Sequence, residues 1–475
     1  MELKQEPQLD PTKLAAAFQD GEEFENVKNM LSSVGVVHID GNGVGAIMRD
    51  LGCAHRAVKV GVSTISDEET TEESKGLQSF IMEVNRRLDN VMKDAIALSW
   101  YDVQKLTPDT VVPIVPVLVG GDDITVYTDG RYAIPFAEAY IHHYERLTKD
   151  DDLLSVLAIV AGGKKADAPE RDHFEIDDYI IQNPGPLTAS AGVAIVGRNF
   201  PFHLAYDLAE GLVKRGKKLG KKKGEVPCST IDFHVLRDAT VLDPDETLDE
   251  YKGRVQRPFL VGHYAPERIG DAPTTSPEEA PTAESQPLPS WECILRAVAV
   301  FDGKKPDDPT QSTGDPFPRA RANRIVKLLA DYVKVPKDDK ARSECLGYVV
   351  LEDNEEAFAT QEQIDNDKQK SDDVKRITKR CKHPICAIRL EWTDAQENAR
   401  GTKALVKALG PLPSKTRLDD PDEHTEDCIE QVRWLLDLID LSENVPDGYL
   451  ACRIGQGNDD GSAATTDDPT EGGAQ

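Results

Sequence analysis

Two stretches of the chain place carboxylates where a β-strand is expected to end. The apolar run "SVGVVHID" ends at Asp40, and "VPVLVGGDDITVYTD" carries Asp122 and Asp123 directly after Gly120 and Gly121. The two glycines permit a tight turn, and the two aspartates begin the return strand of a predicted hairpin. If the strands are neighbours in one sheet, the three carboxylates meet at one edge of that sheet.

Carboxylates gathered at a buried edge repel one another strongly unless a cation neutralises them. Hard oxygen ligands suit Mg²⁺ or Mn²⁺, and such sites use few carboxylates together with substrate phosphates. In "DGNGVG", Gly41, Gly43 and Gly45 are expected to leave backbone N–H groups bare for a triphosphate. Two metal ions there would activate a 3′-hydroxyl and stabilise a pyrophosphate leaving group. The alternative is an acidic β-turn, because Gly-Gly-Asp is ordinary turn chemistry.

A basic run, "VKRGKKLGKKKG" at residues 213–224, stands out in an acidic chain of 85 acidic and 56 basic residues with a net charge of -29. The run lies at the end of a predicted helix, where the helix dipole favours cations in any case. It is also suited to phosphates or RNA, which the rest of the surface would repel. Lys217 is the residue of this run that we expect to point toward the sheet.

The elements around these residues alternate in a regular order of strand, helix, hairpin, helix, strand, helix and strand. The predicted strands beside the hairpin are 33–40, 190–196 and 229–236. The first long helix follows Ser74, and one face of it carries Leu77, Phe80, Ile81, Val84, Leu88, Val91 and Met92. Two further helices are expected near Pro135 and over 202–213. The order predicts an α+β fold, a ferredoxin-like palm whose antiparallel sheet carries helices on one face.

A chain of 475 residues predicts more than one domain. We expect a lead-in over 1–30, the palm over 31–245, a mainly helical domain over 246–454 with a disordered linker near 271–290, and a disordered acidic tail over 455–475. The sequence has no apolar run approaching the roughly 18 residues that span a bilayer, and its start lacks a signal-peptide pattern. It therefore predicts a soluble, cytoplasmic protein with no membrane partner.

Four motifs in this order carry a family resemblance: "HIDGNGVGAIM", "PVLVGGDDITVYT", "SAGVAIVGRNFPFHLAYDLAEGLVKRGKK" and "STIDFHVL". Together they resemble the catalytic palm of the large subunit of type III CRISPR effector complexes, which is related to GGDEF and class III nucleotide cyclase domains. The segment "RPFLVGHYAPERI" and the helices beyond residue 290 resemble the helical C-terminal domain of the same subunit. The resemblance covers roughly residues 30 to 335, and the order of the motifs is its specific part.

The resemblance implies synthesis of cyclic oligoadenylates from ATP, with two Mg²⁺ or Mn²⁺ ions at each site. The residues that match the catalytic, metal-binding carboxylates are Asp40, Asp122 and Asp123. The residues that match nucleotide-binding positions are Gly41, Gly43, Gly45, Gly120, Gly121, Ser190, which opens the "SAG" strand, and Lys217, which faces the triphosphate. RNA and CRISPR-like subunits are further partners that the resemblance implies.

The sequence departs from this family in three respects. It has no HD nuclease, it has one palm where the large subunits usually have two, and Asn42 stands where an aspartate is common, which predicts a weaker second metal site. A single palm cannot hold two nucleotides face to face, so a homodimer or a partner palm on another chain is expected.

Three hypotheses about function follow. The first is an Mg²⁺-dependent nucleotidyltransferase that makes cyclic oligonucleotide messengers from ATP or a related triphosphate, in type III CRISPR-like antiviral signalling. The second is a palm that binds nucleotide or RNA without turnover, as a sensor or scaffold. The third is a GGDEF-type dinucleotide cyclase acting on GTP; against it, isoleucine follows the two aspartates where that family has an acidic residue followed by an aromatic one.

Overall fold

The structure is a computed structural model that describes residues 33–49, 77–107, 111–155, 157, 185–220, 228–237, 243–263, 265, 290–334, 387–388, 391–392, 395, 405, 427–446 and 448–456. The expected lead-in over 1–30, the linker over 271–290 apart from Ser290, and the tail beyond residue 456 lie outside these residues. Residues 455 and 456, which we assigned to the tail, end the last helix.

Six strands form one sheet in the order β2-β3-β1-β4-β5-β6. Their bounds are β1 Ser33–Gly41, β2 Ile114–Gly120, β3 Asp123–Asp129, β4 Ala189–Gly197, β5 Ser229–Val235 and β6 Phe259–Val261. The central strand β1 pairs antiparallel with both β3 and β4, and β4 pairs parallel with β5. Both faces of β1 and β4 are buried, which explains their continuous apolar runs.

The first four strands have the order expected of a ferredoxin-like palm, and the mixed α+β class with a mainly antiparallel sheet is confirmed. Helices α5 (Leu77–Lys105) and α6 (Gly130–Asp150) cover one face of this sheet. Short helices α3 (Val44–Arg49) and α9 (Pro244–Glu250) follow β1 and β5. Pro135, which we expected near a helix start, lies within α6 because that helix begins at residue 130.

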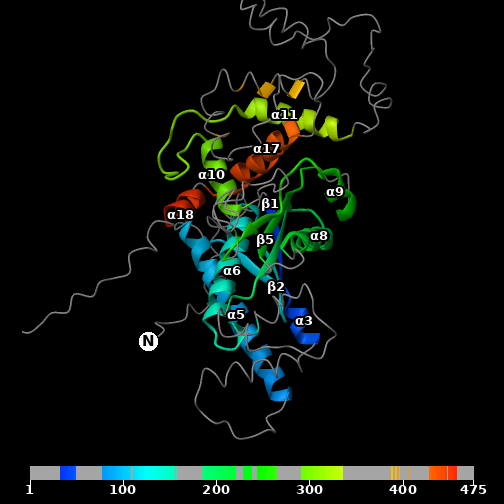
Figure 1. Ribbon diagram of the computed structural model, residues 1–475, viewed down its shortest axis with the longest axis vertical. Helices are drawn as coiled ribbons and strands as arrows, with labels where there is room; N and C mark the ends of the chain where they lie inside the picture. Colours follow the sequence, from blue (N-terminus) through cyan, green and yellow to red (C-terminus); the bar gives the residue numbers. More distant parts are fainter. Residues whose placement is uncertain are drawn as a thin grey trace, which may run out of the picture.

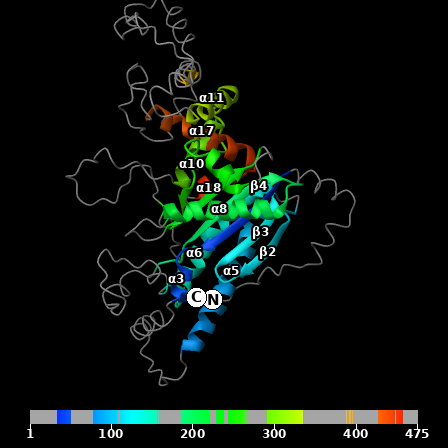
Figure 2. The same cartoon turned by 90° about the vertical axis from the view of Figure 1, so that its right-hand side faces the viewer.

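The expectation that all helices share one face is corrected by α8 (Phe202–Gly220), which packs on the opposite face (Figures 1 and 2). Its apolar side packs against even-numbered residues of β1 and β4, whereas α6 packs against odd-numbered ones. The connections through α6 and α8 both join parallel strands and run the same way across the sheet, yet on opposite faces, so they have opposite hands. The usual right-handed rule would have placed both helices on one face.

The described helices of the C-terminal region are α10 Trp291–Phe301, α11 Arg319–Val333, α17 Asp427–Asn444 and α18 Tyr449–Gln456. They form the upper part of the molecule in Figure 1, and their apolar core is continuous with that of the palm. Phe259 of β6 joins the two parts, because its ring lies 5.8 Å from that of Trp291 and 6.1 Å from that of Trp434. The sheet therefore extends beyond the palm boundary that we expected at residue 245.

Within the described residues, none of the helices has the length and apolar character that a membrane span requires.

Candidate metal centre

The three predicted carboxylates come together at the end of β1. Asp40 pairs with Asp123 across the β1–β3 ladder, and Asp122 lies in the turn that joins β2 to β3. One carboxylate oxygen from each residue lies within 4.8 Å of the other two, and all three side chains are partly buried. Among the described residues, no other group of three acidic, histidine or cysteine side chains is arranged so closely.

The glycines of the turn let the two strands end this close to one another. Gly121 has φ +67°, a left-handed conformation that favours glycine, while a side chain at Gly120 would meet open space. At Gly41, a Cβ atom would lie 3.0 Å from the Cβ of Asp122. The amide of Gly41 donates a hydrogen bond to the carbonyl of Asp122 at 3.1 Å, which closes the end of the sheet.

The hydrogen bonds of this segment correct part of the prediction that its backbone N–H groups bind a triphosphate. The N–H of Gly41 is used by Asp122, and the N–H of Asn42 donates to the carbonyl of Thr188 at 2.7 Å, because the strand ladder continues one residue past Asp40. Gly43 has φ +87°, and Gly45 is an exposed residue of the six-residue helix α3. The part of the "GNGVG" segment that precedes Gly43 is therefore structural.

The carboxyl of Asp123 has a raised pKa. Burial raises its pKa to about 7, and the neighbouring Asp40 and Asp122 add to this effect while Lys217 opposes it. Within the described structure, its Oδ1 atom is buried without a hydrogen-bond partner. A divalent cation would supply the missing partner and relieve the repulsion, so the oxygen donor set fits Mg²⁺ or Mn²⁺.

Lys217, on the last turn of α8, reaches this cluster. Its Nζ forms an ion pair with Asp40 Oδ2 and donates to the carbonyl of Gly41 at 3.1 Å. The close approach of α8 depends on Gly216, where a Cβ atom would lie 2.5 Å from Thr230 Oγ1. The lysine thus supplies a positive charge beside three carboxylates from one side of the sheet.

Asn42 directly follows β1, and Ser190 pairs with Asp40 across the β1–β4 ladder. The hydroxyl of Ser190 donates to Asn42 Oδ1 at 3.0 Å and accepts from Thr230 at 2.9 Å. The Asn42 amide donates to Thr188 Oγ1 at 3.2 Å and to the carbonyl of Cys228 at 3.3 Å. Both side chains are fully buried, so Asn42 is a bridge between strand ends and Ser190 does not reach a surface where a nucleotide would bind.

Sequence reasoning missed Thr188 and Thr230 as members of this network. Thr188 lies two residues before a predicted strand, and Thr230 lies within another. Neither has a sequence pattern that distinguishes it from an ordinary strand threonine. Thr230 faces α8 only because it pairs with Ser190 across β4 and β5.

Two other described basic residues of α8, Lys214 and Arg215, have partners of their own. Arg215 makes two hydrogen bonds to the buried Asp232, at 2.6 and 2.7 Å, and Lys214 pairs with Glu210 at 2.9 Å. Lys221, Lys222 and Lys223 lie outside the described residues. Lys217 is the member of the described run that contacts the carboxylates.

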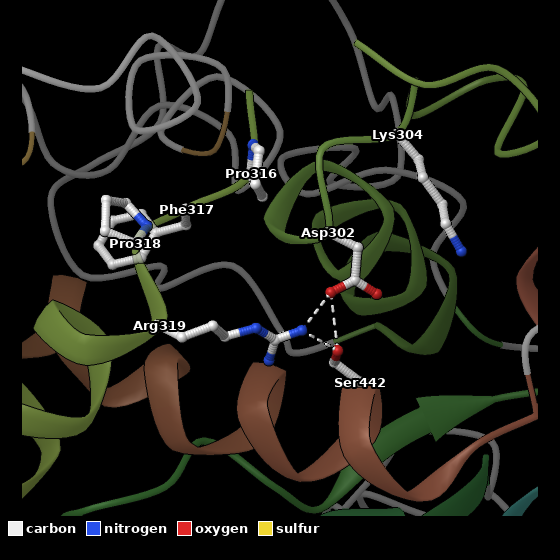
Figure 3. A pocket seen from close by; sticks show the side chains of 7 residues that line it. All are labelled: Asp302, Lys304, Pro316, Phe317, Pro318, Arg319 and Ser442. Atoms are coloured by element: carbon white, nitrogen blue, oxygen red, sulfur yellow. Dashed lines mark hydrogen bonds and ion pairs between the residues drawn. The ribbon is translucent and has the colours of Figure 1, made fainter. Parts of the chain in front are cut away.

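A second polar cluster lines a hollow in the helical region (Figure 3). Arg319, at the start of α11, donates to Asp302 at 2.5 Å and to Ser442 of α17. Ser442 in turn donates to Asp302 at 2.7 Å. These hydrogen bonds tie three helical segments together, so the cluster has an evident structural role.

No known protein-family model matches this chain, and no curated protein sequence matches it either.

Proposed function

We propose that this protein is a metal-dependent nucleotidyltransferase that joins nucleoside triphosphates into a cyclic product, with loss of pyrophosphate. The observation that carries the proposal is the group formed by Asp40, Asp122 and Asp123, with a buried unpartnered oxygen on Asp123 and a lysine beside it. A structural acidic turn gains nothing from holding three carboxylates together, because their repulsion is a cost without a cation.

The residues of the chain would divide the work as follows. The three carboxylates hold and orient the cations, and Lys217 neutralises charge on the triphosphate once it exchanges Asp40 for a phosphate oxygen. Bound Mg²⁺ would supply activation of the attacking 3′-hydroxyl and charge neutralisation at the leaving group. The rigid strand ladder fixes the distance between these groups, so positioning and electrostatics account for catalysis.

A single palm presents one such cluster among its described residues, and joining nucleotides into one ring needs at least two bound nucleotides. A second palm, from another copy of the chain or from a partner chain, completes this proposal. The motif resemblance favours ATP as the substrate, a cyclic oligoadenylate as the product, and antiviral signalling in a type III CRISPR-like setting.

A palm that binds nucleotide without turnover is the second candidate. The ion pair between Lys217 and Asp40 favours it, because that contact already gives one carboxylate a cation of its own. Under this proposal the nucleotide would be held by Lys217 and the metal, and no pyrophosphate would be released.

The experiment that separates the two measures pyrophosphate release and product mass with Mg²⁺ or Mn²⁺ and each of the four ribonucleoside triphosphates. The variant is Asp122→Asn with Asp123→Asn, and the matched control is Asp207→Asn, an exposed aspartate of α8. Cyclic product from wild type and control but not from the double variant supports the enzyme. Saturable nucleotide binding without pyrophosphate, also in the presence of RNA, supports the sensor.

A further inference from the structure

We propose that Tyr206, Phe202 and Tyr127 form an aromatic shelf on which the base of the bound nucleotide stacks. The inference rests on the proposed function, and it names the part of the protein that takes the base once the phosphates lie at the carboxylates.

The shelf and the carboxylates share one face of the sheet. Alternate residues of a strand point to the same side, so Tyr127 lies on the face of Asp123. On the neighbouring strand, His38 lies two residues before Asp40 and pairs with Thr125 of β3. Four residues of strand place Tyr127 about 13 Å along β3 from Asp123, at about 3.3 Å per residue.

Helix α8 brings the other two aromatic rings to this face. The ring of Tyr206 lies 5.2 Å from the ring of His38. Phe202, one turn earlier, stacks on Tyr206 at 6.4 Å and lies 6.1 Å from the ring of Tyr127. The rings therefore form a continuous row that begins beside the carboxylates and leads away from them. Burial, Glu210 and Asp123 raise the pKa of Tyr206, which keeps the phenol neutral beside the acidic site.

At the β2 edge this face is exposed in the described structure, because α8 packs on β1, β4 and β5 and lies beside β2 and β3 (Figure 2). Phe202 is 39% exposed, and on the edge strand β2 Val115 and Leu118 are 48% and 46% exposed. Val115 pairs with Tyr127 and Leu118 pairs with Thr125, so both β2 residues lie on the same face of the sheet as the shelf. Exposed apolar surface that adjoins a polar site marks a place where a ligand or partner binds.

A nucleobase fits this surface better than a second bare copy of the chain. Stacking of a base on aromatic side chains contributes about 1–3 kcal/mol per base. A base also adds no charge beside Glu210 and the carboxylates, whereas an acidic protein surface would add charge there. Because stacking strength grows with ring area and every base has a π-face, we expect purine triphosphates to bind more tightly than pyrimidine triphosphates.

The test compares ligands that share phosphates but differ in the base. Calorimetry on the full chain with Mg²⁺ measures the affinity of ATP, CTP and inorganic tripolyphosphate for wild type, Tyr206→Leu and Tyr206→Phe. The matched control is Tyr101→Leu, which removes an exposed tyrosine from α5 on the other face of the sheet. Melting temperatures and size-exclusion chromatography verify that each variant is folded and report its oligomeric state.

The shelf predicts that Tyr206→Leu weakens ATP binding about 5-fold to 100-fold and leaves tripolyphosphate binding unchanged. Tyr206→Phe and Tyr101→Leu should both bind ATP as wild type does. Equal affinity of wild type for ATP and tripolyphosphate would overturn the shelf and leave the metal and phosphate site standing. Binding of neither ligand by wild type would overturn the proposed function together with the shelf. A dimer that dissociates in Tyr206→Leu, with ATP affinity unchanged, would assign this face to a second copy and overturn the shelf alone.

Discussion

Asp123→Asn is expected to stabilise the metal-free protein above pH 7 and to remove its stabilisation by Mg²⁺. In the folded protein the pKa of Asp123 is about 7, against an ordinary value of 3.8. Below pH 3.8 the carboxyl is protonated in both the folded and unfolded states and costs nothing. As the pH rises from 3.8 to 7, only the unfolded state ionises freely, so the cost to the folded state grows and is complete above pH 7.

The size of this effect follows from the two pKa values. At 1.36 kcal/mol per pH unit, the difference between about 7 and 3.8 corresponds to an upper bound of about 4 kcal/mol. Because Asp123 is only partly buried, water screens the repulsion, and we expect a gain of about 1–2 kcal/mol for the neutral asparagine. For a folded domain of roughly 150–250 residues, a gain of this size in the free energy of unfolding raises the melting temperature by about 2–8 °C.

Metal reverses the order of stability. Mg²⁺ at 100 times its dissociation constant stabilises wild type by about 2.7 kcal/mol, whereas the asparagine variant has lost a charged ligand and gains little. Thermal melting with and without Mg²⁺, at pH 8 and at pH 4, measures both effects beside the control Asp207→Asn. A variant that is less stable than wild type at pH 8 without metal, or that gains as much from Mg²⁺, would refute the reasoning about this site.

Three further substitutions test the scaffold. Gly192→Ala should lower the free energy of unfolding by about 1–3 kcal/mol in urea denaturation, because the added Cβ would lie 2.1 Å from the carbonyl oxygen of Ala209 in α8. An unchanged free energy would show that α8 does not pack this closely on β4. Asn42→Asp should lower the free energy of unfolding by about 1–3 kcal/mol, since it replaces the donor to the Cys228 carbonyl with an acceptor. The same substitution should not tighten Mn²⁺ binding, and tighter binding in a titration would place residue 42 in the metal site. Arg257→Met should cost about 3–5 kcal/mol in urea denaturation, because the arginine donates to the buried Asp440 at 2.8 Å and pairs with the buried Asp437 at 3.5 Å. A smaller loss would mean that Arg237, which donates to Asp440 at 2.9 Å, stabilises this acidic pair without Arg257.

The sequence by itself determined the local features of this protein. Apolar runs and turn glycines located the strands and placed Asp40 and Asp123 at strand ends, because strand length and turn chemistry depend on residues close in the chain. Helical periodicity likewise located the starts of α5 and α8, whereas α8 runs seven residues beyond the expected 213. From these features the meeting of the three carboxylates could be predicted, since strand order then brings their ends to one edge.

Only the tertiary structure decided which neighbours each polar group has. The side of the sheet that α8 covers depends on the hand of a crossover, which the residues of α8 do not encode locally. Asn42 and Ser190 are buried because their hydrogen-bond partners lie inside the protein. These partners are Thr188, Thr230 and the carbonyl of Cys228, which come from segments far apart in the sequence. A buried polar side chain turns toward the partners that satisfy it, and those partners are set by strand register rather than by motif.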